Sequence, residues 1–321
     1  MHKIIIIGAG ELGSRHLQSL VNVAQKIEIE VVDTSLESLE NAKKRFNDVN
    51  SHFKVEISFK TKISDLSKNI DIAIIATNSK VRKLVIQQLV SHATVKYLIL
   101  EKVLFTKVID YDEISQLLRI NKVKTWVNCP RRMMQVYQNL KKEITGTIQL
   151  SVTGSNWGLG CNGIHFLDLF AFLSNSKKIV LTNNLIDETI IESKRKGFDE
   201  FTGTITGESE NNTFQITSLS SGNSPISVTI MTQNTCYQIQ EGPTGTLIKR
   251  NLENQLYLEE QKFSMPFQSQ LTNIVVDQLI ENGDCNLTTL EESSNLHLEF
   301  LSNFISLLQN KNKTIDECLI T

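Results

Sequence analysis

A cysteine and a histidine stand one helical turn apart near the middle of the chain. In the stretch GLGCNGIHFLDLF, residues 158–170, Cys161 precedes His165 by four positions, after a run of glycines and before an apolar segment. A thiol and an imidazole at this spacing suit three arrangements: two ligands of a metal ion, a nucleophile with its base, or the polar entrance of a helix. Other parts of the sequence must distinguish among these.

A metal site needs more ligands than this pair provides. Asp168 is the remaining ligand type nearby, and we interpret it as a helix residue that anchors structure. The chain has five cysteines, an odd number, and no CxxC pair. We therefore expect neither a structural metal site nor a disulfide framework. A cysteine hydrolase built on Cys161 and His165 lacks an evident third residue to orient the histidine.

A second pattern lies at the start of the chain. The stretch KIIIIGAGELGSRHLQSL joins a continuous apolar run, typical of a strand covered on both faces, to a glycine-rich turn and a helical pattern. Gly8, Gly10 and Gly13 complete GxGxxG, and a second apolar run ends at Asp33. In a dinucleotide site the glycines form the turn and admit the pyrophosphate, and the acid accepts the ribose hydroxyls. We predict such a site; the alternative is a plain turn with a surface aspartate.

Strand and helix patterns continue to alternate after this turn, over residues 71–79, 80–91, 96–102 and 124–128. The alternation predicts a doubly wound parallel sheet. Functional residues in such sheets gather at the carboxyl ends of strands, which is where Thr77, Asn78, Glu101 and Lys102 fall. Taken alone, a Glu-Lys pair at such a place is also consistent with a solvated strand end.

The period changes in the second half of the chain. Apolar and polar residues alternate over six short stretches that are typical of strands with one polar face: 148–153, 178–182, 213–218, 226–230, 236–240 and 246–250. A further run spans 255–260. We predict a Rossmann dinucleotide-binding domain with a parallel sheet over residues 1–128. An α/β domain with a large, mostly antiparallel open sheet follows over residues 129–321, and its polar face is a candidate homodimer or homotetramer interface.

Composition argues against several classes of partner. The chain has 321 residues and a formal net charge of −2, and its basic residues are scattered, so we expect no nucleic-acid partner. The apolar run at residues 4–7 is too short for a signal peptide, and no later stretch is long enough to span a bilayer. We expect a cytoplasmic protein without membrane contact, whose partner is a small molecule.

Five segments in order along the whole chain carry a resemblance to a known family: GAGELGSRH, ATN, EKVL, NCPRRM and GCNGIHFLD. Together they resemble the glucose-fructose oxidoreductase and inositol dehydrogenase family (Gfo/Idh/MocA). The resemblance implies an N-terminal Rossmann domain, a C-terminal α/β domain that dimerises through its open sheet, and a nicotinamide cofactor. Members mostly oxidise or reduce carbons of sugars, cyclitols or sugar derivatives. NCPRRM and NWGLGCN also resemble members associated with bacterial surface carbohydrates, including nonulosonic acids.

The resemblance implies roles for individual residues. Lys102 falls on the family's motif lysine and His165 on its motif histidine, and we predict both as catalytic. A histidine suits a base near neutral pH, and a lysine supplies positive charge for a developing alkoxide. We expect the cofactor to contact Gly8, Gly10, Glu11, Leu12, Gly13, Asp33, Thr77, Asn78, Glu101 and Lys102. We expect the substrate to contact Lys102, Arg131, Arg132, Trp157, Cys161, Asn162 and His165.

Two positions depart from the family's pattern. Val103 follows Lys102 where relatives have proline, and we predict a trans bond there, because a cis bond without proline costs about 2.5–4 kcal/mol. Cys161 stands where members with a DxxxH motif have an aspartate four residues before the histidine. We expect this thiol to line the substrate pocket without acting as a nucleophile or a metal ligand.

These patterns favour an NAD-dependent oxidoreductase that acts on a CH–OH group of a sugar or sugar derivative, which includes nucleotide sugars and nonulosonic acids. NAD is preferred to NADP because Asp33 occupies the place of a 2′-phosphate, and no arginine follows it over Thr34-Ser35-Leu36. The alternative is a catalytically impaired NAD-binding regulator or scaffold of the same fold. The direction of the reaction, including a net epimerisation, stays open.

Overall fold

The computed structural model describes residues 1–49, 55–253 and 258–321. The chain divides into two compact units, each assembled from three segments. The first unit comprises Met1–Phe105, Ile109–Pro130 and Pro266–Glu291. The second comprises Thr106–Val108, Arg131–Met265 and Glu292–Thr321. Residues 266–291 therefore return to the first unit. This return could not be predicted from the order of the elements along the sequence.

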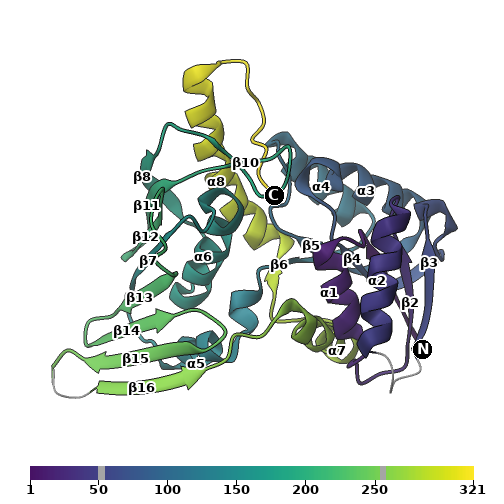
Figure 1. Ribbon diagram of the computed structural model, residues 1–321, viewed down its shortest axis with the longest axis horizontal. Coiled ribbons are helices and arrows are strands. Elements are labelled where there is room, and N and C mark those ends of the chain that lie inside the picture. The colour runs from purple at the N-terminus through teal and green to yellow at the C-terminus, as the bar shows by residue number, and fades with distance from the viewer. Residues whose placement is uncertain (50–54, 254–257) are drawn as a thin grey trace. The chain divides into compact units, whose positions relative to one another are not determined.

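A seven-stranded sheet with the order β17-β6-β5-β4-β1-β2-β3 forms the centre of the first unit (Figure 1). Its strands are β1 (His2–Ile7), β2 (Ile27–Val32), β3 (Glu56–Lys60), β4 (Asn69–Ile75), β5 (Thr94–Glu101), β6 (Lys124–Asn128) and β17 (Thr288–Thr289). All neighbouring strands are parallel except β17, which runs antiparallel to β6. The four consecutive isoleucines of β1 are buried, as a strand with both faces covered requires.

Helices cover both faces of this sheet (Figure 1). Helix α1 (Glu11–Leu20) packs against α2 (Leu36–Val49) and α7 (Thr272–Asn282), and α3 (Ser79–His92) packs against α4 (Ile109–Ile120). The 3-10 helix η3 (Gln268–Gln270) precedes α7 and also packs on α1. The doubly wound parallel sheet that the sequence predicts is confirmed.

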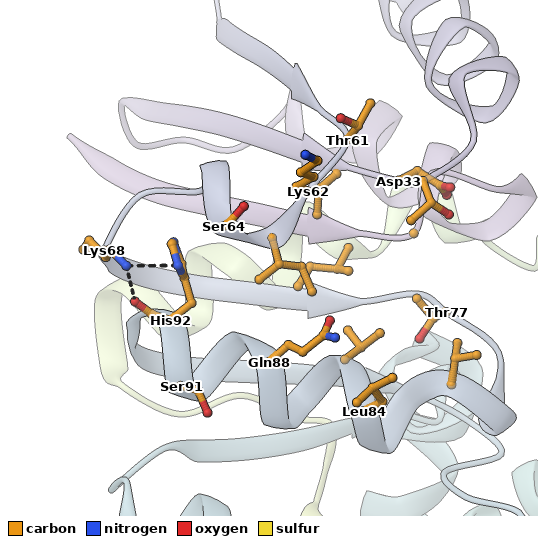
Figure 2. A pocket seen from close by; sticks show the side chains of 17 residues that line it. Asp33, Thr61, Lys62, Ser64, Lys68, Thr77, Leu84, Gln88, Ser91 and His92 are labelled. Carbon is orange, nitrogen blue, oxygen red and sulfur yellow. Dashed lines mark hydrogen bonds between the residues drawn. The ribbon is translucent and has the colours of Figure 1, made fainter.

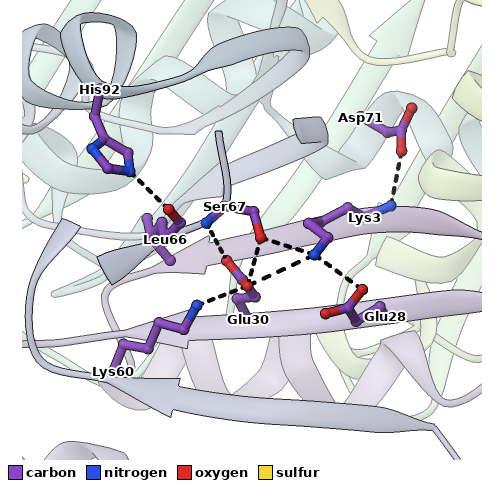
Figure 3. A network of polar contacts seen from close by, with 8 residues as sticks. All are labelled: Lys3, Glu28, Glu30, Lys60, Leu66, Ser67, Asp71 and His92. Atoms are coloured by element: carbon purple, nitrogen blue, oxygen red, sulfur yellow. Dashed lines mark hydrogen bonds and ion pairs between the residues drawn. The ribbon is translucent and has the colours of Figure 1, made fainter. Parts of the chain in front are cut away.

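The connection from β3 to β4 contains no α-helix, and a buried charge network holds it against the sheet. Between β3 and β4 the connection holds only the three-residue 3-10 helix η1 (Ile63–Asp65). Glu30 of β2 is buried there and binds Lys60 at 2.7 Å, and it accepts hydrogen bonds from the amide and hydroxyl of Ser67 (Figure 3). Lys3 lies 3.0 Å from Glu28 in the same network. Burial alone would raise the pKa of Glu30, but Lys60 and Ser67 lower it. These bonds fix segment 61–68 against the sheet.

The bond between Lys102 and Val103 is cis, so our expectation of a trans bond was wrong. That expectation used only the intrinsic preference of a bond without proline. Tertiary contacts at this place are dense, because Val103 is fully buried and the buried guanidinium of Arg82 donates hydrogen bonds to the carbonyls of both Val103 and Leu104.

The second unit contains an eight-stranded sheet with the order β16-β15-β14-β13-β7-β12-β11-β8. Its strands are β7 (Gln149–Ser155), β8 (Val180–Ile186), β11 (Gly203–Ser209), β12 (Asn212–Leu219), β13 (Ser227–Met231), β14 (Thr235–Gln240), β15 (Gly245–Asn251) and β16 (Leu258–Phe263). Neighbours are antiparallel except β7 and β12, so the predicted mostly antiparallel sheet is confirmed. Of the strand expected over 255–260, residues 255–257 lie outside the described residues.

The apolar face of this sheet packs on α6 (Leu159–Ser174), whose central residues are almost all buried. The unit also holds α5 (Gln135–Glu143) and a small hairpin of β9 (Ile191–Glu192) and β10 (Asp199–Glu200). Two further elements cross the division between the units: η2 (Pro130–Met133) and α8 (Leu290–Lys311). Across the described residues, no helix is both long and apolar enough to cross a membrane.

Candidate cofactor and substrate sites

The glycine-rich turn joins β1 to α1 with little space to spare. Gly8 has a φ of +97°, a conformation that favours glycine. A Cβ added at Gly13 would lie 1.8 Å from the carbonyl oxygen of Gly8, so only glycine lets the first turn of α1 approach the end of β1. A Cβ at Gly10 would meet no heavy atom of the described residues within 4 Å. The turn therefore has open space at the glycine where a dinucleotide site admits the pyrophosphate.

Asp33 stands at the carboxyl end of β2 and is tied to this turn. Its Oδ2 accepts a hydrogen bond of 2.7 Å from the amide of Ala9, and its Oδ1 accepts one of 2.8 Å from the amide of Ser35. The side chain is only partly buried, so the carboxylate keeps acceptor capacity for a further donor. This is the position and chemistry expected for an acid that binds ribose hydroxyls.

A cavity of about 840 Å³ opens beside Asp33 in the first unit (Figure 2). Segment 61–68 forms one wall, and one face of α3 forms another. Val81 and Leu84 line the half of the helix wall near Thr77, and Gln88 and His92 line the far half. At the far end, Nε2–H of His92 donates a hydrogen bond of 2.8 Å to the carbonyl of Leu66 and so joins the two walls.

These residues fit an adenosine dinucleotide. The hydroxyl oxygen of Thr77 is buried at the cavity and has no hydrogen-bond partner within the described part of the chain, so it is available to a ligand. Asn78 uses its side chain differently, because it caps α3 by accepting from the amides of Lys80 and Val81. Glu11 is exposed and pairs with Arg45 at 2.6 Å, and Leu12 is partly buried in the same turn.

Glu101 and Lys102 follow each other at the end of β5, and their surroundings differ. Glu101 is almost fully buried and binds His16 at 2.7 Å and Asn128 at 2.6 Å, whereas Lys102 is partly exposed. Burial alone would raise the pKa of Glu101, but the hydrogen bond and charge of His16, with Asn128 and Lys102, lower it. Glu101 therefore carries its charge at neutral pH.

In the second unit, Cys161 meets a carboxylate that the sequence analysis did not single out. The thiol of Cys161 lies 2.7 Å from Oε2 of Glu200, a buried residue of β10. The same carboxylate accepts the amides of Gly160 at 2.5 Å and Phe201 at 2.9 Å. Glu200 thus caps the start of α6, where a negative charge is favourable. In the sequence, the one indication that Glu200 is buried is its place between two phenylalanines, Phe198 and Phe201, and both of these are buried in the structure.

A cavity of about 220 Å³ lies at this helix start. Trp157, Cys161 and Asn162, three of the residues expected to bind substrate, line it together with Glu200 and Lys194. The structure therefore brings these three together in one pocket of the second unit. His165 lies on α6 one turn after Cys161 and is partly exposed.

The two arginines expected to bind substrate have carboxylate partners within their own unit. Arg132 forms a two-bond pair with the fully buried Asp168, at 2.9 and 2.7 Å. Arg131 forms a similar pair with Glu241, at 2.9 and 2.6 Å. Asp168 thus anchors α6, in agreement with its interpretation as a structural residue. In the described residues, no group of three or more His, Cys, Asp or Glu side chains is placed to hold a metal ion.

Comparison with known proteins identifies the first unit. Residues 2–129 match the sequence profile of GFO_IDH_MocA, described as an oxidoreductase family with an NAD-binding Rossmann fold. Residues 2–129 form a domain of the Gfo/Idh/MocA oxidoreductase family. The family predicted from the sequence is confirmed, and with it a coarse function, that of an oxidoreductase that binds NAD or NADP. No curated protein matches the chain.

Solved structures resemble the chain over almost its whole length. An oxidoreductase from Agrobacterium radiobacter, in complex with NAD+, L-tartaric acid and magnesium, has a TM-score of 0.70 at 14% identity and 98% coverage of both chains. KijD10, a 3-ketoreductase from Actinomadura kijaniata in complex with TDP-benzene and NADP, has 0.69 at 12% identity, covering 94% of this chain and 96% of its own. The super-repressor mutant of Gal80p from Saccharomyces cerevisiae has 0.71 at 13% identity and 96% coverage of both. Such identities establish the fold only.

Exchanging Gly10 and Gly13 separately should distinguish a cofactor contact from a folding requirement. Gly10→Ala should leave the melting temperature nearly unchanged, because its Cβ meets no protein atom, yet weaken NAD binding at least about tenfold, or ~1.4 kcal/mol. Gly13→Ala should lower the melting temperature itself, because of the contact with Gly8. Calorimetric NAD binding and thermal unfolding measure the two effects. Unchanged NAD affinity in Gly10→Ala would contradict a pyrophosphate contact at this turn.

Restoring an aspartate at position 161 should destabilise the protein. Cys161→Asp places a second carboxylate against Glu200, and we expect a loss of about 1–3 kcal/mol in the free energy of unfolding at neutral pH. The loss should shrink in acid, where one carboxylate is protonated, and in the double variant Cys161→Asp/Glu200→Gln. Cys161→Ser, which keeps a donor, is the control in denaturant unfolding. Equal stability of the Asp and Ser variants at pH 7 would refute this reading.

Proposed function

We propose that the protein is an NAD-dependent oxidoreductase that transfers a hydride to or from a carbon of a sugar or sugar derivative. The observation that carries the cofactor assignment is the 840 Å³ cavity that begins at the glycine turn and Asp33. It holds the hydroxyl of Thr77, which has no hydrogen-bond partner among the described residues. The sugar-type substrate rests on the resemblance to the Gfo/Idh/MocA family. The second cavity is lined by polar and charged residues, among them Asn162, Lys194 and Glu200, and this lining supports a polar ligand.

Each catalytic residue has one task in this proposal. A bound nicotinamide supplies the site that accepts or donates the hydride. His165 takes the hydroxyl proton during oxidation, or returns it during reduction, and Lys102 stabilises negative charge on the substrate oxygen. The Cys161 thiol donates to Glu200, so it is held as a thiol and is not available as a nucleophile. This geometry argues against a cysteine hydrolase.

The second candidate is an NAD-binding regulator or scaffold of the same fold. One observation favours it: the similarity of the whole chain to Gal80p, whose super-repressor mutant has the same fold.

In either case we propose a homodimer, or a tetramer of dimers, that forms through the outer face of the second sheet. Polar side chains such as Thr153, Thr213 and Gln215 are exposed on this face. A hydride-transfer assay separates an enzyme from a regulator.

We predict a preference for NAD over NADP. The Asp33 carboxylate would repel a 2′-phosphate, but the structure adds a residue that the sequence analysis did not consider, because Lys62 lines the same cavity. We expect the dissociation constant of NAD to be at least about tenfold lower, a difference of ~1.4 kcal/mol. Lys62→Ala is the control: if Lys62 neutralises a phosphate, this variant loses affinity for NADP alone. A wild-type preference for NADP would overturn the assignment.

Turnover should depend on Lys102 and His165. A screen that follows the absorbance of reduced nicotinamide against sugars, nucleotide sugars and nonulosonates identifies a substrate. With that substrate, Lys102→Ala and His165→Asn should each lower kcat by about 10²–10⁴-fold, because each removes a group that acts on the reacting oxygen. Lys96→Ala is the control, because Lys96 is an exposed lysine of β5, the strand that ends just before Lys102. No hydride transfer with any substrate class would favour the regulator, and near-normal kcat in both variants would remove both residues from the mechanism.

A further inference from the structure

A buried polar network joins four parts of the first unit behind the end of β5. His16 of α1 contacts Glu101 through Nε2 at 2.7 Å, and Asn128 at the end of β6 donates to the same carboxylate oxygen at 2.6 Å. The returning segment closes the network: Thr272 lies 2.9 Å from Nδ1 of His16, and the Gln268 side chain accepts from Asn128 at 2.9 Å. His16, Glu101, Asn128 and Thr272 are each at most 4% exposed.

The donors and acceptors of this network determine where protons lie. Glu101 is ionised, so it only accepts, and Nε2 of His16 must carry a proton to make the contact. The Thr272 hydroxyl accepts from the Gln268 amide at 3.0 Å and has one proton of its own. That proton goes to Nδ1 of His16 or to the Gln268 carbonyl at 3.3 Å. Every arrangement leaves Nε2–H pointing at Glu101, whether His16 is neutral or charged.

The network connects the two regions of the first unit that a dinucleotide uses. His16 is on the buried face of α1, whose first turn forms the phosphate end of the glycine turn. Glu101 directly precedes Lys102. A buried ion pair adds little net stability compared with apolar side chains of the same size, whereas it fixes orientation through directional bonds. Stability alone is therefore a weak reason for a buried pair of a carboxylate and an imidazole here.

We propose that His16 is a positioning residue, which holds the Glu101 carboxylate and thereby fixes the strand end that carries Lys102 relative to the glycine turn. This inference rests on the proposed function, because it assigns a role in binding the nicotinamide dinucleotide. The groups that face Glu101 are His16 of α1, Asn128 of β6 and the charge of Lys102; those that face His16 from the return are the uncharged Gln268 and Thr272. Among these contacts, His16 and Asn128 are the two side chains that donate hydrogen bonds to Glu101.

The matched variants are His16→Gln and His16→Met. Glutamine can place an amide donor near the position of Nε2, while methionine keeps the volume and removes the donor. Without the donor, burial raises the pKa of Glu101, and protonation breaks the charge-assisted bonds that join α1, β5 and β6. We expect the Kd for NAD of His16→Met to rise at least about fivefold between about pH 8 and about pH 6. The Kd values of wild type and His16→Gln should change less than about twofold.

Ser19→Ala controls for loosened packing. Ser19 binds Asn273 and also ties α1 to α7, but it lies outside the Glu101 network. Its Kd should show the pH dependence of the wild type. Calorimetric binding and thermal unfolding are measured for all variants at each pH. If His16→Met and His16→Gln bind NAD equally at every pH, or if Ser19→Ala reproduces the effect of His16→Met, the proposal is overturned.

Failure of this inference differs from failure of the proposed function. If the wild type binds neither NAD nor NADP at any pH, the cofactor assignment itself is wrong. If the wild type binds NAD and the His16→Met affinity does not depend on pH, only the positioning role is wrong. Should His16→Met fail to fold, Glu101→Gln gives the same decision: it keeps the shape of Glu101 without its charge, and it should bind NAD weakly at all pH values.

Discussion

The close approach of α1 to the end of β1 is the constraint on which the first unit depends. At Gly13 there is no room for a side chain, since a Cβ would lie 1.8 Å from the Gly8 carbonyl oxygen. This approach places the amide of Ala9 against Asp33 and the buried face of α1 over the sheet. His16 can reach Glu101 only because the helix lies so near. The glycine pattern thus does more than form a phosphate turn. It also allows α1 to lie close enough to the sheet for His16 to bind Glu101.

Much of the fold was predictable because it follows from local periodicity. Buried isoleucines in β1, glycines in a fixed turn and alternating residues in β7 and β13 each determine a strand, a turn or a face without distant partners. The family followed from segments that keep their order along the chain. The place of Asp33, directly after β2 and beside the glycine turn, was predictable for the same reason, because it depends on local strand and turn patterns.

The remaining features depend on contacts between residues far apart in the sequence. Glu200 reaches Cys161 from the β9–β10 hairpin, and Gln268 reaches Asn128 through the returning segment. The cis bond after Lys102 occurs where Arg82 from α3 binds the following carbonyls. Neither spacing nor composition indicates such meetings. Two signals were available: a polar residue at a buried helix position, which is His16, and a charged residue close to buried phenylalanines, which is Glu200.

Cys161 and Glu200 together explain a departure from the family pattern in physical terms. The start of α6 favours one negative charge, and Glu200 supplies it while it accepts backbone amides of the same turn. A second carboxylate at position 161 would lie within contact distance of the first, where two like charges raise each other's pKa. A thiol avoids this cost and still donates to Glu200. The charge of the site is therefore retained, but it comes from a different part of the chain.

Buried carboxylates also determine how the first unit responds to acid. Glu30 and Glu101 are buried, and in both the hydrogen bonds of neighbouring side chains overcome burial and lower the pKa in the folded state. A carboxyl group whose folded pKa lies below its unfolded value stabilises the fold above the unfolded pKa. That stability is lost as the pH falls through the folded pKa. Because Glu30 fixes segment 61–68 and Glu101 joins α1 to β5 and β6, both the walls of the large cavity and the support of its glycine turn should weaken in acid. Acid sensitivity in this unit is therefore a consequence of using buried charge to position a binding site.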